Sequence, residues 1–166
     1  MSDPISSTPP PSALRQSSPL PPVSPLGIDP RGPRFGAGIT AVLLVVVLLL
    51  SGGAATALLA VIAALFAVGT ARGAQRTVQG LIFRRLVRPR LAPPAELEDA
   101  RPPRFAQLVG LIIAGVGVLL GLAGVTVAVP VAAALALVAA SLNSAFGLCL
   151  GCELYVLGAR LRSRAA

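Results

Sequence analysis

The sequence has no lysine and no histidine, and only two cysteines and one methionine among 166 residues. Without histidine it cannot build a Ser/His/Asp triad, and the usual zinc ligand sets are incomplete. Charge is also scarce: 12% of residues are charged, whereas 55% are hydrophobic. A water-soluble domain of this size would need more charge to cover its surface. The composition therefore predicts a membrane protein of one domain.

All fourteen positive charges are arginines, against six acidic residues, which gives a net charge of +8. No basic or aromatic module of a familiar nucleic-acid-binding type is present, so nucleic acid is not an expected partner. In a membrane protein, arginines instead hold loops in the cytoplasm and contact anionic lipids of the inner leaflet. Arginine without lysine, together with abundant alanine, indicates a GC-rich bacterial genome.

Residues 1–27 contain eight prolines and seven serines. Such a segment buries too little apolar surface to offset its ordering entropy, so we expect a disordered tail. No short apolar run followed by a small-residue cleavage site marks it as a secretory signal. The membrane domain is expected over 28–160, with a basic tail at 159–166.

Two long apolar blocks follow the tail, and each is long enough for two spanning helices of about 20 residues. Ser51–Ala54 (SGGA) divides the first block, and the stretch around Gly124–Pro130 divides the second. The expected spans are 36–51, 54–71, 105–123 and 127–157. The first span is short, so we expect it to begin earlier. The last is long, so it should project or bend, at Asn143-Ser144 or at Gly147.

A seven-residue motif precedes each predicted hairpin. Asp29–Phe35 reads DPRGPRF and Asp99–Phe105 reads DARPPRF, with five identical positions at an offset of seventy. The match indicates duplication of a two-helix unit, as repeat one at 28–71 and repeat two at 99–158. A two-helix unit returns to its starting side, so the two hairpins are parallel. The predicted fold class is an all-α membrane protein with four transmembrane helices.

The arginines predict the topology. They precede the first span, fill the loop 72–98 and follow the last span, whereas both hairpin tips are uncharged. The positive-inside rule then places both termini and the central loop in the cytoplasm of a bacterial inner membrane. Within the loop, apolar residues recur at helical spacing between Val78 and Leu86. They predict either a short basic helix on the inner leaflet or a solvated linker.

The only two cysteines, Cys149 and Cys152, lie at CxxC spacing in the last apolar segment. On a helix they would share one face with their α-carbons about 5 Å apart, within disulfide range. Gly147 and Gly151 have the spacing that permits close approach by a helix or a partner thiol. A redox pair is one interpretation, and packing cysteines in a structural subunit are the other. Two thiolates could also hold Cu(I), whereas zinc would require a homo-oligomer to complete four ligands. No cofactor is expected.

Several polar residues accompany the cysteines. Glu153 is a costly charge at the membrane edge, so we expect it to pair with one of four repeat arginines or to accept a thiol proton. Those arginines could instead anchor the chain in lipid headgroups or bind a small anion; they are Arg31, Arg34, Arg101 and Arg104. The aspartates Asp29 and Asp99 open the repeat motifs. Asn143 is expected to hydrogen-bond between helices. The end of a spanning helix, next to a carboxylate, would disfavour a thiolate.

The strings IDPRGPRFGAGI and LNSAFGLCLGCELY resemble the bacterial membrane family catalogued as domain of unknown function 4395, over about residues 27–160. The resemblance implies a four-helix membrane protein and carries no assigned activity. Gly147-Leu148-Cys149 is also similar to the end of a two-helix hairpin attached to some rhodanese-type sulfurtransferases, although Leu150 stands where that hairpin has proline. This second resemblance implies sulfur or thiol traffic.

Three functions remain open from the sequence. The first is a thiol-redox or sulfur-transfer protein with a thioredoxin-like or sulfurtransferase partner. The second is a structural membrane subunit or scaffold. The third is a permease for a small sulfur-containing anion, against which the few polar residues within the spans count. Whether the chain is an enzyme is not decided by the sequence.

Overall fold

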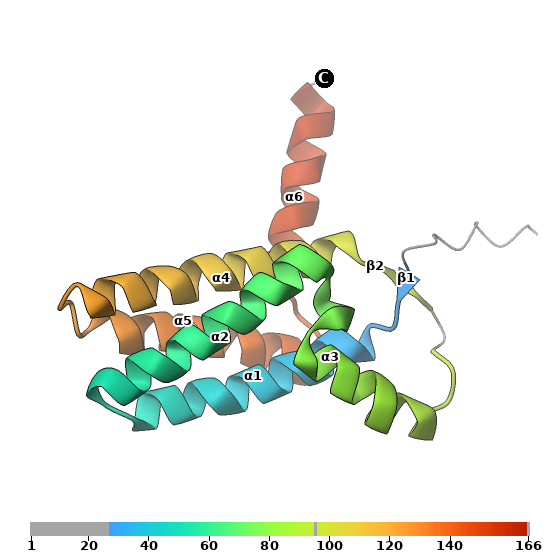
Figure 1. Ribbon diagram of the computed structural model, residues 1–166. Helices are drawn as coiled ribbons and strands as arrows, with labels where there is room; N and C mark the ends of the chain where they lie inside the picture. The colour runs from blue at the N-terminus through green and yellow to red at the C-terminus, as the bar shows by residue number, and fades with distance from the viewer. Residues whose placement is uncertain (1–26, 95, 166) are drawn as a thin grey trace, which may run out of the picture.

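The computed structural model describes residues 27–94 and 96–165. Its body is a bundle of four long helices that run side by side in Figure 1: α1 (Arg31–Leu49), α2 (Gly52–Arg72), α4 (Arg101–Leu122) and α5 (Ala128–Phe146). All four are long and apolar enough to cross a membrane. The prediction of an all-α, four-span membrane protein is confirmed. The segment for which disorder was expected lies outside the described residues, except for Gly27.

The helices begin where the sequence turns from polar to apolar, but one turn earlier than the apolar blocks suggest. α1 starts at Arg31 and α4 at Arg101, so each repeat motif forms the first turn of its helix. Prolines in both motifs fit there because the first N–H groups of a helix have no intrahelical partner. The first hairpin turns at Gly52 with φ +59° and the second at Gly124 with φ +92°. Both positions favour glycine.

The two repeats interlock. α1 packs against α2 and α5, and α4 packs against the same two helices. The first helix of each repeat therefore contacts the second helix of both repeats. The bundle has two ends: the hairpin tips lie at one end, and the other, called the arginine end here, is where α1 and α4 begin and α2 and α5 finish (Figure 1).

Alanine and glycine allow the helices to pack closely. Leu44, Leu59 and Ile62 are fully buried, and around them lie alanines such as Ala114 and Ala133. Large apolar residues point outward along all four helices, including Val42, Val61, Ile112 and Val138. An apolar surface of this extent suits lipid, and small residues at helix contacts are typical of membrane bundles.

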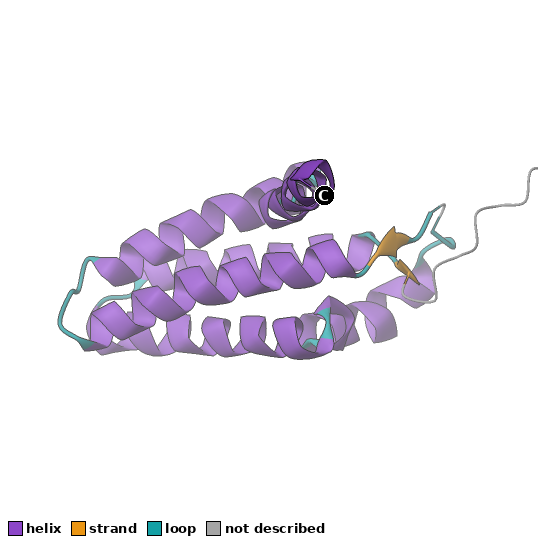
Figure 2. Cartoon of the chain, turned by 90° about the horizontal axis from the view of Figure 1, so that it is seen from above, coloured by secondary structure: helices purple, strands orange, loops and turns teal. Residues whose placement is uncertain are grey.

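The repeat motifs also pair with each other at the arginine end. Strand β1 (Gly27–Ile28) runs antiparallel to β2 (Glu98–Asp99), with Gly27 opposite Asp99. Figure 2 shows this two-stranded ribbon beyond the helix ends. The pairing ties the segment before α1 to the segment before α4, which are seventy residues apart in the sequence.

A short helix follows each hairpin. After α2, helix η1 (Ala74–Arg76) leads into α3 (Val78–Ile82), which continues as a π-helical turn η2 (Phe83–Val87) and a 3-10 turn η3 (Arg88–Arg90). Of the two interpretations of the segment from Val78 to Leu86, a helix and a solvated linker, the helix is the one present, and its position on the inner leaflet stays a prediction. After α5, helix α6 (Leu150–Ala165) projects crosswise to the bundle (Figures 1 and 2).

The repeat phenylalanines anchor these two short helices. Phe35 packs on Phe83, with ring centroids 5.7 Å apart, and Phe105 packs on Tyr155 at 5.8 Å. α3 accordingly contacts α1, and α6 contacts α4. Each repeat thus consists of a hairpin followed by a short helix that returns to the first helix of its own repeat.

Candidate functional site

The candidate site lies where α5 gives way to α6. Gly147 follows α5 with φ +71°, a left-handed conformation that glycine adopts without a Cβ penalty. Its N–H bonds to the carbonyl of Asn143 at 3.1 Å, and the N–H of Leu148 bonds to that of Leu142 at 3.2 Å. These bonds satisfy carbonyls at the end of α5 and stop the helix.

The prediction of one long helix over 127–157 is therefore wrong, whereas the predicted bend at Gly147 is confirmed. Asn143 was expected to bridge helices with its side chain. In the structure, the main-chain carbonyl of Asn143 accepts the N–H of Gly147 at the end of α5. The break changes the setting of the cysteines, because they no longer lie at the end of a spanning helix.

Cys149 immediately precedes α6 and Cys152 lies in its first turn. The main-chain N–H of Cys152 donates to Cys149 Sγ at 3.3 Å, and the N–H of Glu153 donates to the Cys149 carbonyl at 3.0 Å. Cys149 therefore occupies the capping position of α6. The two sulfurs form a disulfide, and the α-carbons are 5.1 Å apart.

This arrangement corrects one of the two reasons for expecting a disfavoured thiolate, the helix end, whereas the Glu153 carboxylate still lies nearby in the first turn of α6. The pair lies at the N-terminus of α6, where unpaired N–H groups and the helix dipole favour negative charge on a thiol. Both cysteines are half-buried. The backbone thus places Cys149 at the beginning of a helix and not at the end of one, which the sequence does not show.

Gly151 fixes the cysteines against the bundle. A Cβ added to Gly151 would lie 2.5 Å from the Cα of Ala106 in α4. The predicted close approach of a neighbouring helix is therefore present at Gly151. At Gly147 the close neighbour is a side chain, since an added Cβ would overlap the guanidinium of Arg34. Arg34 is thus the repeat arginine that the structure brings to the junction.

Glu153 is exposed and sits in the first turn of α6. Within residues 27–94 and 96–165, the recorded ion pair joins Arg31 to Asp29, and Glu153 takes part in none. The expected pairing with a repeat arginine is not observed. A carboxylate in the first turn already interacts favourably with the helix N-terminus, so it needs no arginine there.

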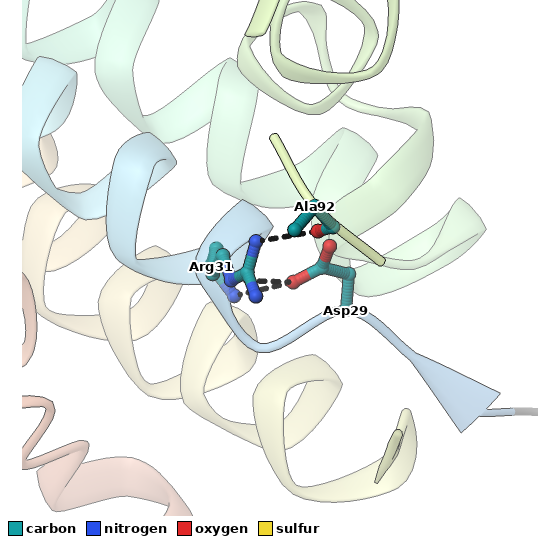
Figure 3. Close-up of polar contacts among 3 residues, drawn as sticks. All are labelled: Asp29, Arg31 and Ala92. Carbon is teal, nitrogen blue, oxygen red and sulfur yellow. Dashed lines mark hydrogen bonds and ion pairs between the residues drawn. The ribbon is translucent and has the colours of Figure 1, made fainter. Parts of the chain in front are cut away.

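The other repeat residues hold the motifs themselves. Asp29 Oδ1 accepts the N–H of Arg31 at 3.0 Å, and Asp99 Oδ1 accepts the N–H of Arg101 at 2.9 Å. Figure 3 shows the first of these, where the Arg31 guanidinium also donates to the Ala92 carbonyl at 3.0 Å. Equivalent aspartates therefore make the same contact in both repeats, which supports the duplication.

Arg104 closes the end of α2. Its Nε donates to the Thr70 carbonyl at 2.5 Å and its Nη2 to the Ala71 carbonyl at 2.9 Å. A cation at a helix C-terminus also complements the dipole. Arg31 and Arg104 thus serve as links between segments that are far apart in the sequence.

A cluster of arginines from the central loop was not among the candidate site residues expected from the sequence. Arg72, Arg76, Arg84 and Arg88 line a cavity of about 650 Å³ together with Arg104. The spacing of four in the pairs 72/76 and 84/88 is visible in the sequence, but α2 ends at Arg72 and Gly73 has φ +88°, so helical spacing alone does not bring Arg72 and Arg76 together. Over the described part of the chain, no group of three His, Cys, Asp or Glu side chains gathers around a potential metal site.

Comparison with known proteins identifies the family of this chain but no individual related protein. A family model described as "Domain of unknown function (DUF4395)" matches residues 28–160. No curated protein and no solved structure matches the chain. The likeness to the rhodanese-associated hairpin is not shown by these matches. Since the family model covers well over half of the chain, the protein belongs to the DUF4395 family.

Proposed function

We propose that this membrane protein exchanges its Cys149–Cys152 disulfide with a soluble, thioredoxin-like dithiol protein at the cytoplasmic face of a bacterial inner membrane. The observation that carries the proposal is the position of the pair, disulfide-bonded at the start of α6 with Cys149 Sγ accepting the N–H of Cys152. Two sulfurs at bonding distance can open and close without unfolding α6, because their α-carbons are already 5.1 Å apart.

The cytoplasmic orientation rests on the arginines. The arginines of the described chain lie near the arginine end or in α6, and the hairpin tips at Ser51–Ala54 and around Gly124 carry no charge. The positive-inside rule assigns the arginine end to the cytoplasm. The junction between α5 and α6 lies at that end, so the disulfide is within reach of soluble reductants there.

The chemistry of α6 supports a location at the membrane boundary. Leu150, Leu154, Leu157 and Leu161 are all exposed, and their spacing of four, three and four aligns them in one row. Arg160 and Arg164 lie beside that row. An amphipathic helix that leaves the bundle crosswise is suited to the lipid interface, where leucines enter the acyl region and arginines meet anionic headgroups. The disulfide at its start would then sit at the water boundary.

The geometry also supports an order for the two cysteines. Cys149 Sγ occupies the position toward which the first N–H groups of α6 point, so its thiolate is the stabilised one. Cys149 is accordingly the sulfur that bonds to the partner. Cys152, three residues later, is the resolving thiol.

The exchange proceeds through a mixed disulfide between Cys149 and the partner. A thiolate of the reduced partner attacks Cys149 Sγ, the Cys149–Cys152 bond breaks, and the Cys152 sulfur leaves as a thiolate that takes a proton from water. The partner's second thiolate then attacks the mixed disulfide and releases Cys149. Two electrons pass from the partner dithiol to this protein, and the partner departs with a disulfide. The reverse sequence oxidises this protein.

Trapping the mixed disulfide tests the proposal. Cys152→Ser leaves Cys149 able to attack an oxidised partner but removes the thiol that would resolve the complex. It should therefore accumulate a covalent, reductant-sensitive adduct, analysed by non-reducing gel and mass spectrometry of the membrane fraction. Cys149→Ser is the matched control and should accumulate much less. If neither variant yields an adduct with a dithiol protein, the proposal fails and the cysteines have a structural role.

A further inference from the structure

The arginine-lined cavity at the arginine end of the bundle is separate from the cysteines. The cavity of about 650 Å³ lies between the start of α1, the end of α2 and the helical segment from η1 to η3, and neither cysteine lines it. Five of its lining residues are arginines: Arg72, Arg76, Arg84, Arg88 and Arg104. It is therefore a concave and strongly cationic surface.

Little negative charge offsets these arginines. Among the residues described, Asp29 is the one carboxylate that lines the cavity. Its side chain is only 8% exposed and is already engaged by Arg31, through the N–H bond at 3.0 Å and an ion pair at 4.0 Å. The described lining thus holds five arginines and one carboxylate, and that carboxylate is paired with a sixth arginine, Arg31, which does not line the cavity.

The guanidinium groups also retain donors. The Nε and one terminal nitrogen of Arg104 donate hydrogen bonds to the α2 carbonyls, so its other terminal nitrogen is available to a ligand. For Arg72, Arg76, Arg84 and Arg88, no side-chain hydrogen bond or ion pair is recorded within the described ranges. Guanidinium groups with unused paired donors fit the oxygens of a phosphate group.

Apart from Gln75, the other lining residues are apolar or glycine. Ile28 and Phe83 are buried there, and Phe83 is held in place by Phe35. Glycines contribute the remaining backbone, including Gly73 at the end of α2 and Gly80 in α3. The cavity therefore combines a cationic wall with a small apolar floor and room above it.

We infer that this cavity binds a phosphate group, carried either by the headgroup of an anionic phospholipid or by a soluble phosphate compound. Both sources offer the same chemistry, an oxyanion for the guanidiniums with an organic portion for the apolar floor. Both can reach the arginine end of a membrane-spanning bundle. This site goes beyond the proposed thiol exchange and does not depend on it.

Binding to the purified full-length protein in neutral detergent tests the inference. Thermal unfolding is followed against increasing short-chain phosphatidylglycerol, inorganic phosphate, and short-chain phosphatidylcholine as the zwitterionic control. Saturable stabilisation by phosphatidylglycerol alone identifies a lipid headgroup, and saturation by inorganic phosphate as well identifies a soluble source. Stabilisation by neither, or equally by phosphatidylcholine, overturns the inference.

Two variants that lose the same number of charges distinguish binding in the cavity from general electrostatic attraction to the protein. Arg84→Gln/Arg88→Gln removes two lining arginines, and Arg85→Gln/Arg90→Gln removes two arginines of the same helical segment that do not line the cavity. Each arginine near a headgroup contributes about fivefold in affinity, so the cavity variant should bind about 25-fold more weakly. The Arg85→Gln/Arg90→Gln variant should bind nearly as the wild type does. Equal weakening of both variants contradicts a specific site.

A single substitution guards against misfolding of the double variant. Arg76 lines the cavity, is exposed and lies in the short helix η1. Arg76→Gln should leave the unfolding temperature without ligand unchanged and weaken phosphatidylglycerol or phosphate binding about fivefold. Wild-type affinity in this variant would count against the site. Maleimide labelling of the reduced cysteines, which lie outside the cavity, should be the same in all these variants.

Discussion

Gly151 contacts the main chain of Ala106: a Cβ on Gly151 would lie 2.5 Å from the Ala106 Cα. This contact seats the first turn of α6, and the disulfide with it, against α4. It is also the point at which one methyl group would displace the candidate site.

Gly151→Ala should therefore loosen α6. Overpacking against a backbone atom costs about 1–3 kcal/mol, so amide hydrogen exchange in α6 should accelerate by at least about fivefold. Gly158→Ala is the matched control, because Gly158 lies in the same helix with nothing within 4 Å of its added Cβ. That substitution should leave exchange unchanged or slow it, since alanine favours a helix by up to about 1 kcal/mol. Equal exchange in the two variants would contradict the packing.

A second prediction concerns the contact between α4 and α5. A Cβ on Gly117 would overlap the Ala132 Cβ and lie 3.2 Å from Leu59 Cδ2, whereas Gly115 faces open space. Gly117→Ala should lower the free energy of unfolding by about 1–3 kcal/mol. Gly115→Ala, two residues away on the same helix, should lower it by much less or not at all. Thermal unfolding in detergent micelles compares them, and a Gly115→Ala loss as large as that of Gly117→Ala would refute this packing.

The two repeat aspartates should differ in importance despite their equivalent contacts. Asp29→Ala and Asp99→Ala each remove an acceptor at a helix start, which costs about 0.5–2 kcal/mol. Asp29 should cost more, because its side chain is buried and also pairs with Arg31, so its loss leaves that arginine unpaired. Denaturation of both variants provides the comparison. A larger loss for Asp99→Ala would show that the β1–β2 end of the bundle is held differently.

The spans and the repeat could be read from the sequence because each depends on local composition. The first and third helices start at Arg31 and Arg101, earlier than the apolar blocks at 36 and 105, because arginine and proline lower the hydropathy of residues that nonetheless form the first turn. The expectation that the first span begins earlier is confirmed. Gly147 was identified as a bend point, but its left-handed conformation was not. Because of that conformation, the predicted last span consists of two helices, α5 and α6. The cysteines therefore lie at the start of α6 and not at the end of a spanning helix.

Contacts between distant segments were harder to predict. The sequence indicated that Glu153 needs a partner, but the helix N-terminus that stabilises it exists only because of the break before α6. The roles of Arg104 as a cap on α2 and of Arg34 against Gly147 depend on how the two repeats interlock. The arginine cavity likewise needs residues from both repeats, and no local pattern brings them together.

Introduced cysteines in the same chain provide reference positions for the side of the membrane on which Cys149 and Cys152 lie. In a background of Cys149→Ser/Cys152→Ser, a cysteine introduced at Ser51 reports on the hairpin tips, and one introduced at Ser163 reports on α6. Both serines are exposed. A membrane-impermeant maleimide should label the first in right-side-out vesicles and the second in inside-out vesicles.

The most direct measurement of the central claim is the labelling of the native pair by that maleimide, before and after treatment with a membrane-permeant dithiol that is then removed. The account predicts that Cys149 is unreactive while oxidised, reacts after reduction in inside-out vesicles, and stays unlabelled in right-side-out vesicles. Labelling only in right-side-out vesicles, or in neither when the Ser163 position does react, would contradict a cytoplasm-facing, exchangeable disulfide.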